Sequence, residues 1–412
     1  MHYPPRLDRR FWRIWTAAGI SSLGDGMVLV AFPLLALSYT RQPVLIAGVA
    51  VAGTLPWLLI GLPAGALADR INRRKLMVGI ETARLGLLGL FGALVLSGRS
   101  NLAVLYGTVF LLRALGVVFD VTAGAALPTV VTSRLLFKAN ANLATAQTVA
   151  EEVAGQAIGG IAFALTASLP FIADAATFAA SAGLLSRALP DNEPSTAKTS
   201  FMSDVIEGLR VFMRLPLLRI LTGLIASFAF CQALVLSVLV LYAVQDLHMS
   251  RSGYGILLGV SAVGTAVTSL GANQIHVRIG TGWSILGAGF AAAAAYPILA
   301  FTSSPVTAGG ALALESAGVI VGNISARALR QSVVPQELQG RMASTYLMVI
   351  RTSVPVGALA GGLLVTQMGV RHTFLLAGLV QLGVLGLTAP KLLAALRRQN
   401  STVEVGQRAL AA

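Results

Sequence analysis

Three ionisable residues, Asp25, Arg113 and Glu315, fall near the middle of long apolar segments. A charge at the centre of a bilayer costs about 2.5–3.5 kcal/mol even on permissive insertion scales, so such residues face protein or a wet cavity. Burial favours the neutral form of a carboxyl group, whereas a nearby guanidinium favours the ionised form. The sequence therefore predicts that Asp25 and Arg113 form a proton-linked pair, with Glu315 across the same cavity. The alternative is a fixed structural ion pair. Trp57 could stack on a substrate there, or pack only against helices or lipid.

Other charges inside apolar segments have simpler interpretations. Glu81 and Arg84 are three residues apart on one expected helix, which favours an intrahelical pair. Glu151 and Glu152 lie about two turns inside another segment, at a depth similar to that of Arg351. A latch between these carboxylates and Arg351 is one hypothesis, and a purely structural role is the other.

The segments that carry these charges number about twelve, each long enough to span a bilayer with about 20 residues. Hydrophobic residues make up 56% of the 412-residue chain and charged residues only 11%, against roughly 25% in soluble domains. Of the 30 Lys and Arg residues, 23 fall on one set of loops and tails and 4 on the opposite loops. By the positive-inside rule, both termini are cytoplasmic. The net charge of +14 then reflects topology and lipid headgroups, and predicts no nucleic-acid partner.

Several function classes find no support in the sequence. Cys231 is the single cysteine and the four histidines are scattered, so no metal site is predicted. The phosphate-binding pattern G-x-x-x-x-G-K-[ST] does not occur, and neither do H-E-x-x-H or G-x-S-x-G. We expect a protein that is not an enzyme and needs no cofactor.

The chain divides into two similar halves. Shifted by 202 positions, residues 112–117 fall on 314–319, and the glycines of 155–160 fall on those of 357–362. We predict a six-helix bundle over 1–188, a cytoplasmic linker with an amphipathic helix over 189–218, and a second bundle with a cytoplasmic tail over 219–412. Two repeated bundles are typical of transporters that bind substrate near the membrane midplane.

A short charged loop carries a family resemblance. Residues 65–75 read G-A-L-A-D-R-I-N-R-R-K, which resembles the loop signature G-x-L-x-D-R-x-G-R-[RK]-[RK] of the major facilitator superfamily. Asn72 replaces the usual glycine, and both types tolerate a left-handed backbone. The resemblance implies a gating motif with the residues Gly65, Asp69, Arg70, Arg73, Arg74 and Asp120. In it, Asp69, Arg73 and Asp120 form a charge cluster that latches the outward-open state, and Gly65 lets the second helix approach the eleventh. The alternative is that these arginines only fix the topology.

Further matches point to one branch, the transmembrane secretion effectors, which include siderophore and macrolide exporters. The matching runs are Gly24-Asp25-Gly26, residues 62–65, Phe119-Asp120, residues 174–178 and residues 334–341. Asp174 itself is expected to be structural. The branch implies twelve transmembrane helices in two pseudo-symmetric bundles, an all-α membrane protein.

Glycines in the fifth and eleventh segments form the last motif. Gly155, Gly159 and Gly160 resemble the exporter signature G-P-x-x-G-G, with Gln156 in place of its proline. Spacing of four residues predicts a small-residue face for close helix packing, repeated by Gly357 and Gly361. Packing alone is an equally good explanation of these glycines.

Together these features predict a multi-pass protein of the cell membrane, monomeric, that exports amphipathic small molecules (a drug, macrolide, siderophore or secondary metabolite) in exchange for protons. An importer or facilitator of the same fold is the nearest alternative. A non-transport membrane sensor is the other. Neither substrate identity nor coupling ion follows from the sequence.

Overall fold

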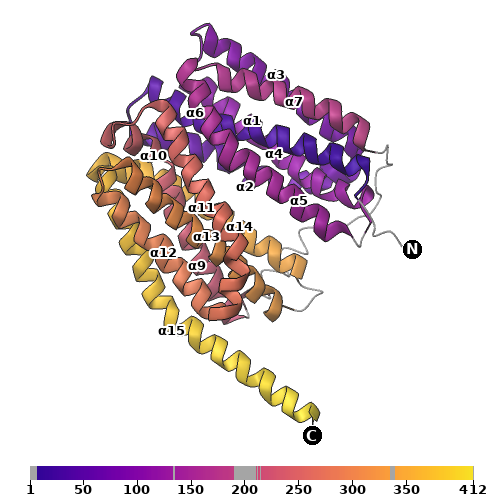
Figure 1. The fold of residues 1–412 in the computed structure, drawn as a ribbon, viewed down its shortest axis with the longest axis vertical. Coiled ribbons are helices and arrows are strands. Elements are labelled where there is room, and N and C mark those ends of the chain that lie inside the picture. The colour runs from indigo at the N-terminus through magenta and orange to yellow at the C-terminus, as the bar shows by residue number, and fades with distance from the viewer. Residues whose placement is uncertain are drawn as a thin grey trace. The chain divides into compact units, whose positions relative to one another are not determined.

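A computed structural model describes residues 7–132, 135–189, 210, 212–213, 215–334 and 339–411, and all regular elements in these ranges are helical. Figure 1 shows their arrangement. The α-helices are α1 (Arg9–Tyr39), α2 (Pro43–Arg70), α3 (Arg73–Leu96), α4 (Leu102–Ala126), α5 (Leu136–Thr148), α6 (Gln156–Leu165), α7 (Leu169–Ala188), α9 (Pro216–Leu236), α10 (Leu239–Leu241), α11 (Arg251–Ile279), α12 (Thr281–Phe301), α13 (Pro305–Val333), α14 (Gln339–Met368) and α15 (Val370–Ala411). A 3-10 turn (Leu127–Thr129) and two π-helical segments (Val149–Gly155 and Tyr242–Asp246) interrupt them.

Local sequence explains where several helices begin. The Asn101 side chain accepts a hydrogen bond from the backbone of Val104 at 3.0 Å and caps α4. Asn72 does the same for α3, accepting from Lys75 at 3.2 Å. Its φ of −54° is not left-handed. Asn72 therefore acts here as a helix cap, in a backbone conformation that does not require glycine.

Ten helices are long and apolar enough to cross a membrane in the described part of the chain. The all-helical membrane fold is thus confirmed, while the count of twelve stays a prediction. Two expected spans are not among the ten. The fifth is divided into α5, a π-helical segment and α6, so no single piece reaches 18 residues. The eighth corresponds to α11, which has 29 residues.

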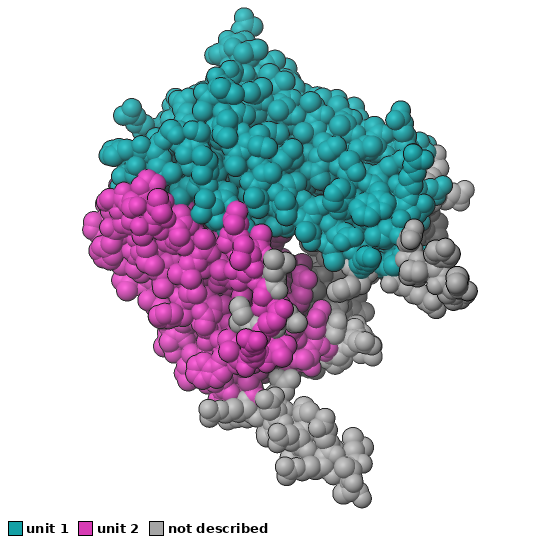
Figure 2. Space-filling model, in the orientation of Figure 1, with its two compact units in different colours: residues 1–199, 237–262 teal, residues 200–236, 263–412 magenta. Residues whose placement is uncertain are grey.

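The chain forms two compact units, coloured separately in Figure 2. Unit 1 comprises 1–199 and 237–262, and unit 2 comprises 200–236 and 263–412. Residues 237–262, which follow α9 and include α10 and the start of α11, therefore belong to unit 1. The sequence analysis instead begins the second bundle at residue 219. The predicted amphipathic linker helix lies almost wholly outside the described residues.

The same helix pairs pack in each unit. In unit 1, α1 packs on α7 and on the α5–α6 segment, and α3 packs on α7. In unit 2, α9 packs on α15 and on α14, and α12 packs on α15. These pairs occupy corresponding places in the two sequence repeats. In unit 1 they make α1 the central helix, with the buried aromatic cluster Phe32, Phe91 and Phe171 near one end.

Candidate functional site in unit 1

A small polar cavity of about 90 Å³ lies among the helices of unit 1. Residues of α1, α2, α3, α4, α5 and the following π-helical segment line it, so the cavity lies inside the helix bundle of this unit. Its ionisable lining residues are Asp25, Arg84, Arg113, Asp120 and Glu151. Trp57 and Gln147 are among the remaining lining residues. The cavity therefore brings together Asp25, Arg113, Trp57 and Asp120, four of the candidate residues identified from the sequence.

The sequence Gly24-Asp25-Gly26 positions Asp25 on α1. A Cβ on Gly24 would lie 2.7 Å from the Cγ of Asp174 on α7. A Cβ on Gly26 would lie 2.9 Å from the carbonyl carbon of Glu151. Both flanking glycines thus allow close packing against neighbouring segments, and the Asp25 side chain between them reaches the cavity.

The π-helical segment Val149–Gly155 lines the cavity through Glu151. A π-bulge inserts one extra residue into a helical turn and is frequent at functional sites. Gly155 ends this segment, and a Cβ on it would lie 2.6 Å from the backbone oxygen of Leu23 and 2.9 Å from the Cα of Gly26. The backbones of α1 and the segment are therefore in direct contact, which holds Glu151 beside the cavity.

Asp25 and Arg113 share the cavity without a direct ion pair. Among the described residues, no contact within 4.0 Å joins their charged atoms. Glu151 interacts electrostatically with both of them and also with Asp120. The cavity lining combines three carboxyl groups (Asp25, Asp120 and Glu151) with two guanidinium groups (Arg84 and Arg113) around a space for a few water molecules. Water in such a cavity can reach the carboxyl groups that line it.

Arg84 is the cation that the sequence did not assign to this cavity. It is buried, lies 3.8 Å from Glu81 and stacks over the rings of Phe119 and Phe178 at 5.3 and 5.1 Å. A Cβ on Gly116 would lie only 2.5 Å from its Nη2 atom. Gly116 therefore leaves the space that lets Arg84 reach from α3 into the cavity. The expected pair with Glu81 is present, as part of a larger network.

A second cavity of about 530 Å³ adjoins the first and shares five lining residues with it: Ala18, Phe119, Asp120, Gln147 and Glu151. Its lining is largely apolar, including Ile14, Met77, Leu127 and Leu185. Asp120, Glu151 and Glu152 are its charged residues, all acidic. Its volume falls in the range of small-molecule sites, about 300–1,000 Å³. The sequence analysis missed this cavity because its walls come from five separate segments of the chain.

Glu315 belongs to unit 2 and is not among the lining residues of either cavity. It is 3% exposed, accepts hydrogen bonds at its Oε1 from Gln232 at 2.9 Å and Tyr296 at 3.4 Å, and contacts Ser316 at 3.4 Å. All its described partners are neutral, so burial is offset by hydrogen bonds rather than by an ion pair. The expected position in one cavity with Asp25 stays a prediction.

The charged loop places Arg73 against α4. Its Nη1 donates to the backbone oxygen of Ala125 at 3.1 Å. Asp69 and Gly65 lie in α2, but their side-chain surroundings are outside the described part of the structure. Arg70 is exposed at the end of α2, and Arg74 is half-buried in the first turn of α3.

The motif glycines all lie at close helix contacts where their surroundings are described. A Cβ on Gly159 would lie 2.6 Å from the Cα of Met27, and one on Gly160 would lie 2.8 Å from the Cα of Gly255 in the part of α11 that belongs to unit 1. In unit 2, a Cβ on Gly357 would lie 3.0 Å from the Cα of Phe230. Gly361 is buried one turn further along α14.

Membrane-length helices around cavities lined by ionisable residues define a membrane transporter. The family model of transmembrane secretion effectors matches residues 2–404, and the chain belongs to this family of major facilitator transporters.

Relatives agree with this assignment. The chain is 26% identical over 402 residues to the multidrug efflux pump Tap of Mycolicibacterium fortuitum, covering 91% of this chain and 94% of that protein. It is 27% identical over 374 residues to the uncharacterized transporter y4rN of Sinorhizobium fredii, covering 88% and 90%.

Solved structures show the same fold. The nucleoside transporter NupG aligns with a TM-score of 0.73 at 12% identity, covering 95% of this chain and 100% of that chain. A bacterial homologue of the iron transporter ferroportin, in its inward-facing state, aligns with a TM-score of 0.69 at 17% identity, covering 93% and 100%.

Proposed function

We propose that this transporter exports amphipathic small molecules from the cell in exchange for protons, by alternating access of its two halves. The observation that carries the proposal is the shared cavity of Asp25, Arg113 and Glu151 at the middle of an apolar bundle. Carboxylates at such a depth are costly to retain and mark ion or proton pathways in membrane proteins. The relative named as a multidrug efflux pump supports the direction of transport and the substrate class.

Asp25 is the proton carrier in this proposal, and Arg113 is its partner. With the cavity closed and dry, the carboxyl group keeps its proton; with water and the guanidinium close by, it releases the proton. Substrate binding and protonation then compete for the same conformational state. Glu315 provides a second carboxyl group in unit 2, and Trp57 offers an aromatic face to the substrate.

The larger cavity is the proposed substrate vestibule. Its apolar walls suit a hydrophobic body, and its acidic rim of Asp120, Glu151 and Glu152 suits a basic amine. A lipophilic cation combines both features. Such a substrate would reach Glu151, which also lines the smaller cavity, and thereby sense the protonation of Asp25.

The loop signature serves as the proposed gate. The hydrogen bond from Arg73 to Ala125 joins the start of α3 to the end of α4. In this proposal the charged residues of the loop therefore move together with the end of α4. The role of Asp69, Arg70 and Arg74 in latching one state rests on the family resemblance.

Gradient-driven uptake into proteoliposomes tests this function. A panel of lipophilic cations, macrolides and siderophores is offered to vesicles whose interior is more acidic than the medium. A proton antiporter accumulates its substrate above the outside concentration, and collapse of the pH gradient with a protonophore releases it. A facilitator only equilibrates the substrate, with or without the gradient. A sensor moves none of the compounds.

A further inference from the structure

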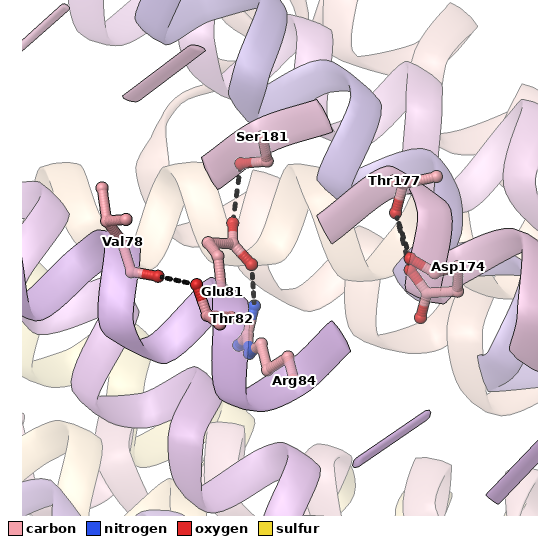
Figure 3. Close-up of polar contacts among 7 residues, drawn as sticks. All are labelled: Val78, Glu81, Thr82, Arg84, Asp174, Thr177 and Ser181. Atoms are coloured by element: carbon pink, nitrogen blue, oxygen red, sulfur yellow. Dashed lines mark hydrogen bonds and ion pairs between the residues drawn. The ribbon is translucent and has the colours of Figure 1, made fainter. Parts of the chain in front are cut away.

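Asp174 is a buried carboxyl group that the cavity chemistry leaves unused. It lies on α7, is 0% exposed, and forms no ion pair within 4.0 Å with any described cation. Its Oδ2 atom has no hydrogen-bond partner within the part of the chain that the structure describes. Figure 3 shows it beside Thr177, one turn further along the same helix.

The hydrogen atoms around Asp174 can be counted. Thr177 Oγ1 lies 2.8 Å from the backbone oxygen of Asp174 and 2.8 Å from its Oδ1. A threonine hydroxyl carries a single hydrogen. When that hydrogen is donated to the backbone oxygen, as is common for threonine within helices, the contact with Oδ1 needs a hydrogen from the carboxyl group.

The charged groups around Asp174 also indicate that its carboxyl group carries a proton. Two elements bring charged or titratable groups toward it: α1 contributes Asp25, and α3 contributes Glu81 and Arg84. Helix α6, which also packs on α7, contains no titratable residue. The surroundings therefore hold two other carboxyl groups and one guanidinium.

That guanidinium is already engaged. Arg84 lies 3.8 Å from Glu81 Oε2, and Glu81 Oε1 accepts a hydrogen bond from Ser181 at 2.7 Å. Figure 3 shows Glu81 between these two partners. The remaining faces of the guanidinium cover Phe119 and Phe178. Asp174 is a second buried carboxyl group without an ionic partner among the described residues, so it would bind a proton rather than stay charged.

We propose that Asp174 is a second proton-binding site of this transporter, which carries a proton while Asp25 is ionised. Gly24 packs directly on the Asp174 carboxyl group, and Asp25 is the next residue along α1. The two carboxyl groups are therefore neighbours. Two neighbouring carboxyl groups resist being ionised together. Loss of the proton from one is therefore coupled to its retention by the other. The part that Asp174 plays in transport rests on the proposed proton exchange, whereas its protonation in the resting protein does not.

Infrared difference spectroscopy of the full-length protein in lipid nanodiscs at pH 7 tests the proposal. A protonated carboxyl group has a C=O stretching band that is separate from carboxylate bands and shifts in D2O. We expect this band to lose intensity in Asp174→Asn and to remain in the matched control Glu81→Gln. An unchanged band in Asp174→Asn would overturn the proposal.

A second variant keeps the test decisive if Asp174→Asn does not fold. Thr177→Val removes the hydroxyl group that receives the Asp174 proton while keeping the side-chain volume. We expect the band to shift in frequency in this variant, since the O–H of the carboxyl group loses its hydrogen-bond acceptor. A band of unchanged frequency would mean that the proton lies on another residue. Neither result depends on whether the protein transports protons.

Discussion

The carboxyl group of Asp174 fills the space beside Gly24 that a side chain would otherwise occupy, with its Cγ only 2.7 Å from where a Cβ would lie. Asp25 is the next residue on α1 and lines the small cavity. A single step along α1, from Gly24 to Asp25, therefore leads from a buried carboxyl group on α7 to a carboxyl group that lines the cavity. The next residue, Gly26, packs on Glu151.

Gly24→Ala should destabilise the protein. The added methyl group overlaps the carboxyl group of a fully buried residue, and overpacking of this kind costs about 1–3 kcal/mol. We expect a lower midpoint of thermal unfolding in detergent. Gly19→Ala is the matched control on the same helix, because nothing lies within 4 Å of its added Cβ. Equal midpoints for the two variants would show that α1 and α7 do not approach as closely as described.

Asp174→Asn should flatten the dependence of stability on pH. If the native state holds a proton on Asp174 that the unfolded chain releases above pH ~3.9, the native state binds one proton more than the unfolded state. The free energy of unfolding then falls with rising pH by up to about 1.4 kcal/mol per pH unit from this site. The asparagine variant lacks this contribution, so its unfolding midpoint should decrease less between pH 5 and pH 7. A variant with the same slope as the wild type would contradict a native-state proton on Asp174.

The hydrogen bonds of Glu315 predict different costs for two substitutions. Glu315→Leu leaves the Gln232 amide and the Tyr296 hydroxyl without their shared acceptor, at a cost of about 1–3 kcal/mol for a buried unsatisfied group. Glu315→Gln keeps an oxygen in nearly the same place and should cost less. Unfolding midpoints of the two variants measure the difference. If the glutamine variant were the less stable one, the charge of Glu315 rather than its acceptor oxygen would hold this part of unit 2 together.

Neutralising the acidic rim should change substrate preference. In Glu152→Gln we expect the KM for a lipophilic cation to rise about 5- to 30-fold, which corresponds to roughly 1–2 kcal/mol of lost attraction. The KM for a neutral compound of similar shape should stay within about twofold. Competition between the two substrates in proteoliposomes measures both values. An equal rise for both compounds would mean that the substitution alters the cavity rather than its charge.

Much of this site was accessible from the sequence because intramembrane charge is rare. Asp25 and Arg113 stand out in apolar segments, and the structure places both on one cavity. Glycines spaced four apart likewise pointed to close helix contacts, and Gly155 and Gly159 lie at such contacts with α1. In each case a local pattern carries the information, since a charge or a glycine pair inside an apolar segment can be recognised before any contact is known.

The remaining features depend on contacts between distant residues. Arg84 looked like half of a local pair, but the space that brings it to the cavity comes from Gly116, 32 positions further along the chain. Asp174 was expected to be structural, and nothing in its neighbouring sequence indicates that it packs on Gly24. The π-helical segment at Glu151 also has no reliable sequence signal, because it differs from an α-helix by one inserted residue.

Substrate exchange by Asp25→Asn tests the central claim most directly. In proteoliposomes without any gradient, external labelled lipophilic cation exchanges against internal unlabelled cation, a reaction that needs binding and alternation but no proton. We predict that Asp25→Asn retains this exchange and loses accumulation driven by a pH gradient, while the wild type performs both. Gradient-driven accumulation at the wild-type level in Asp25→Asn would contradict the account, because the proton would then be carried elsewhere.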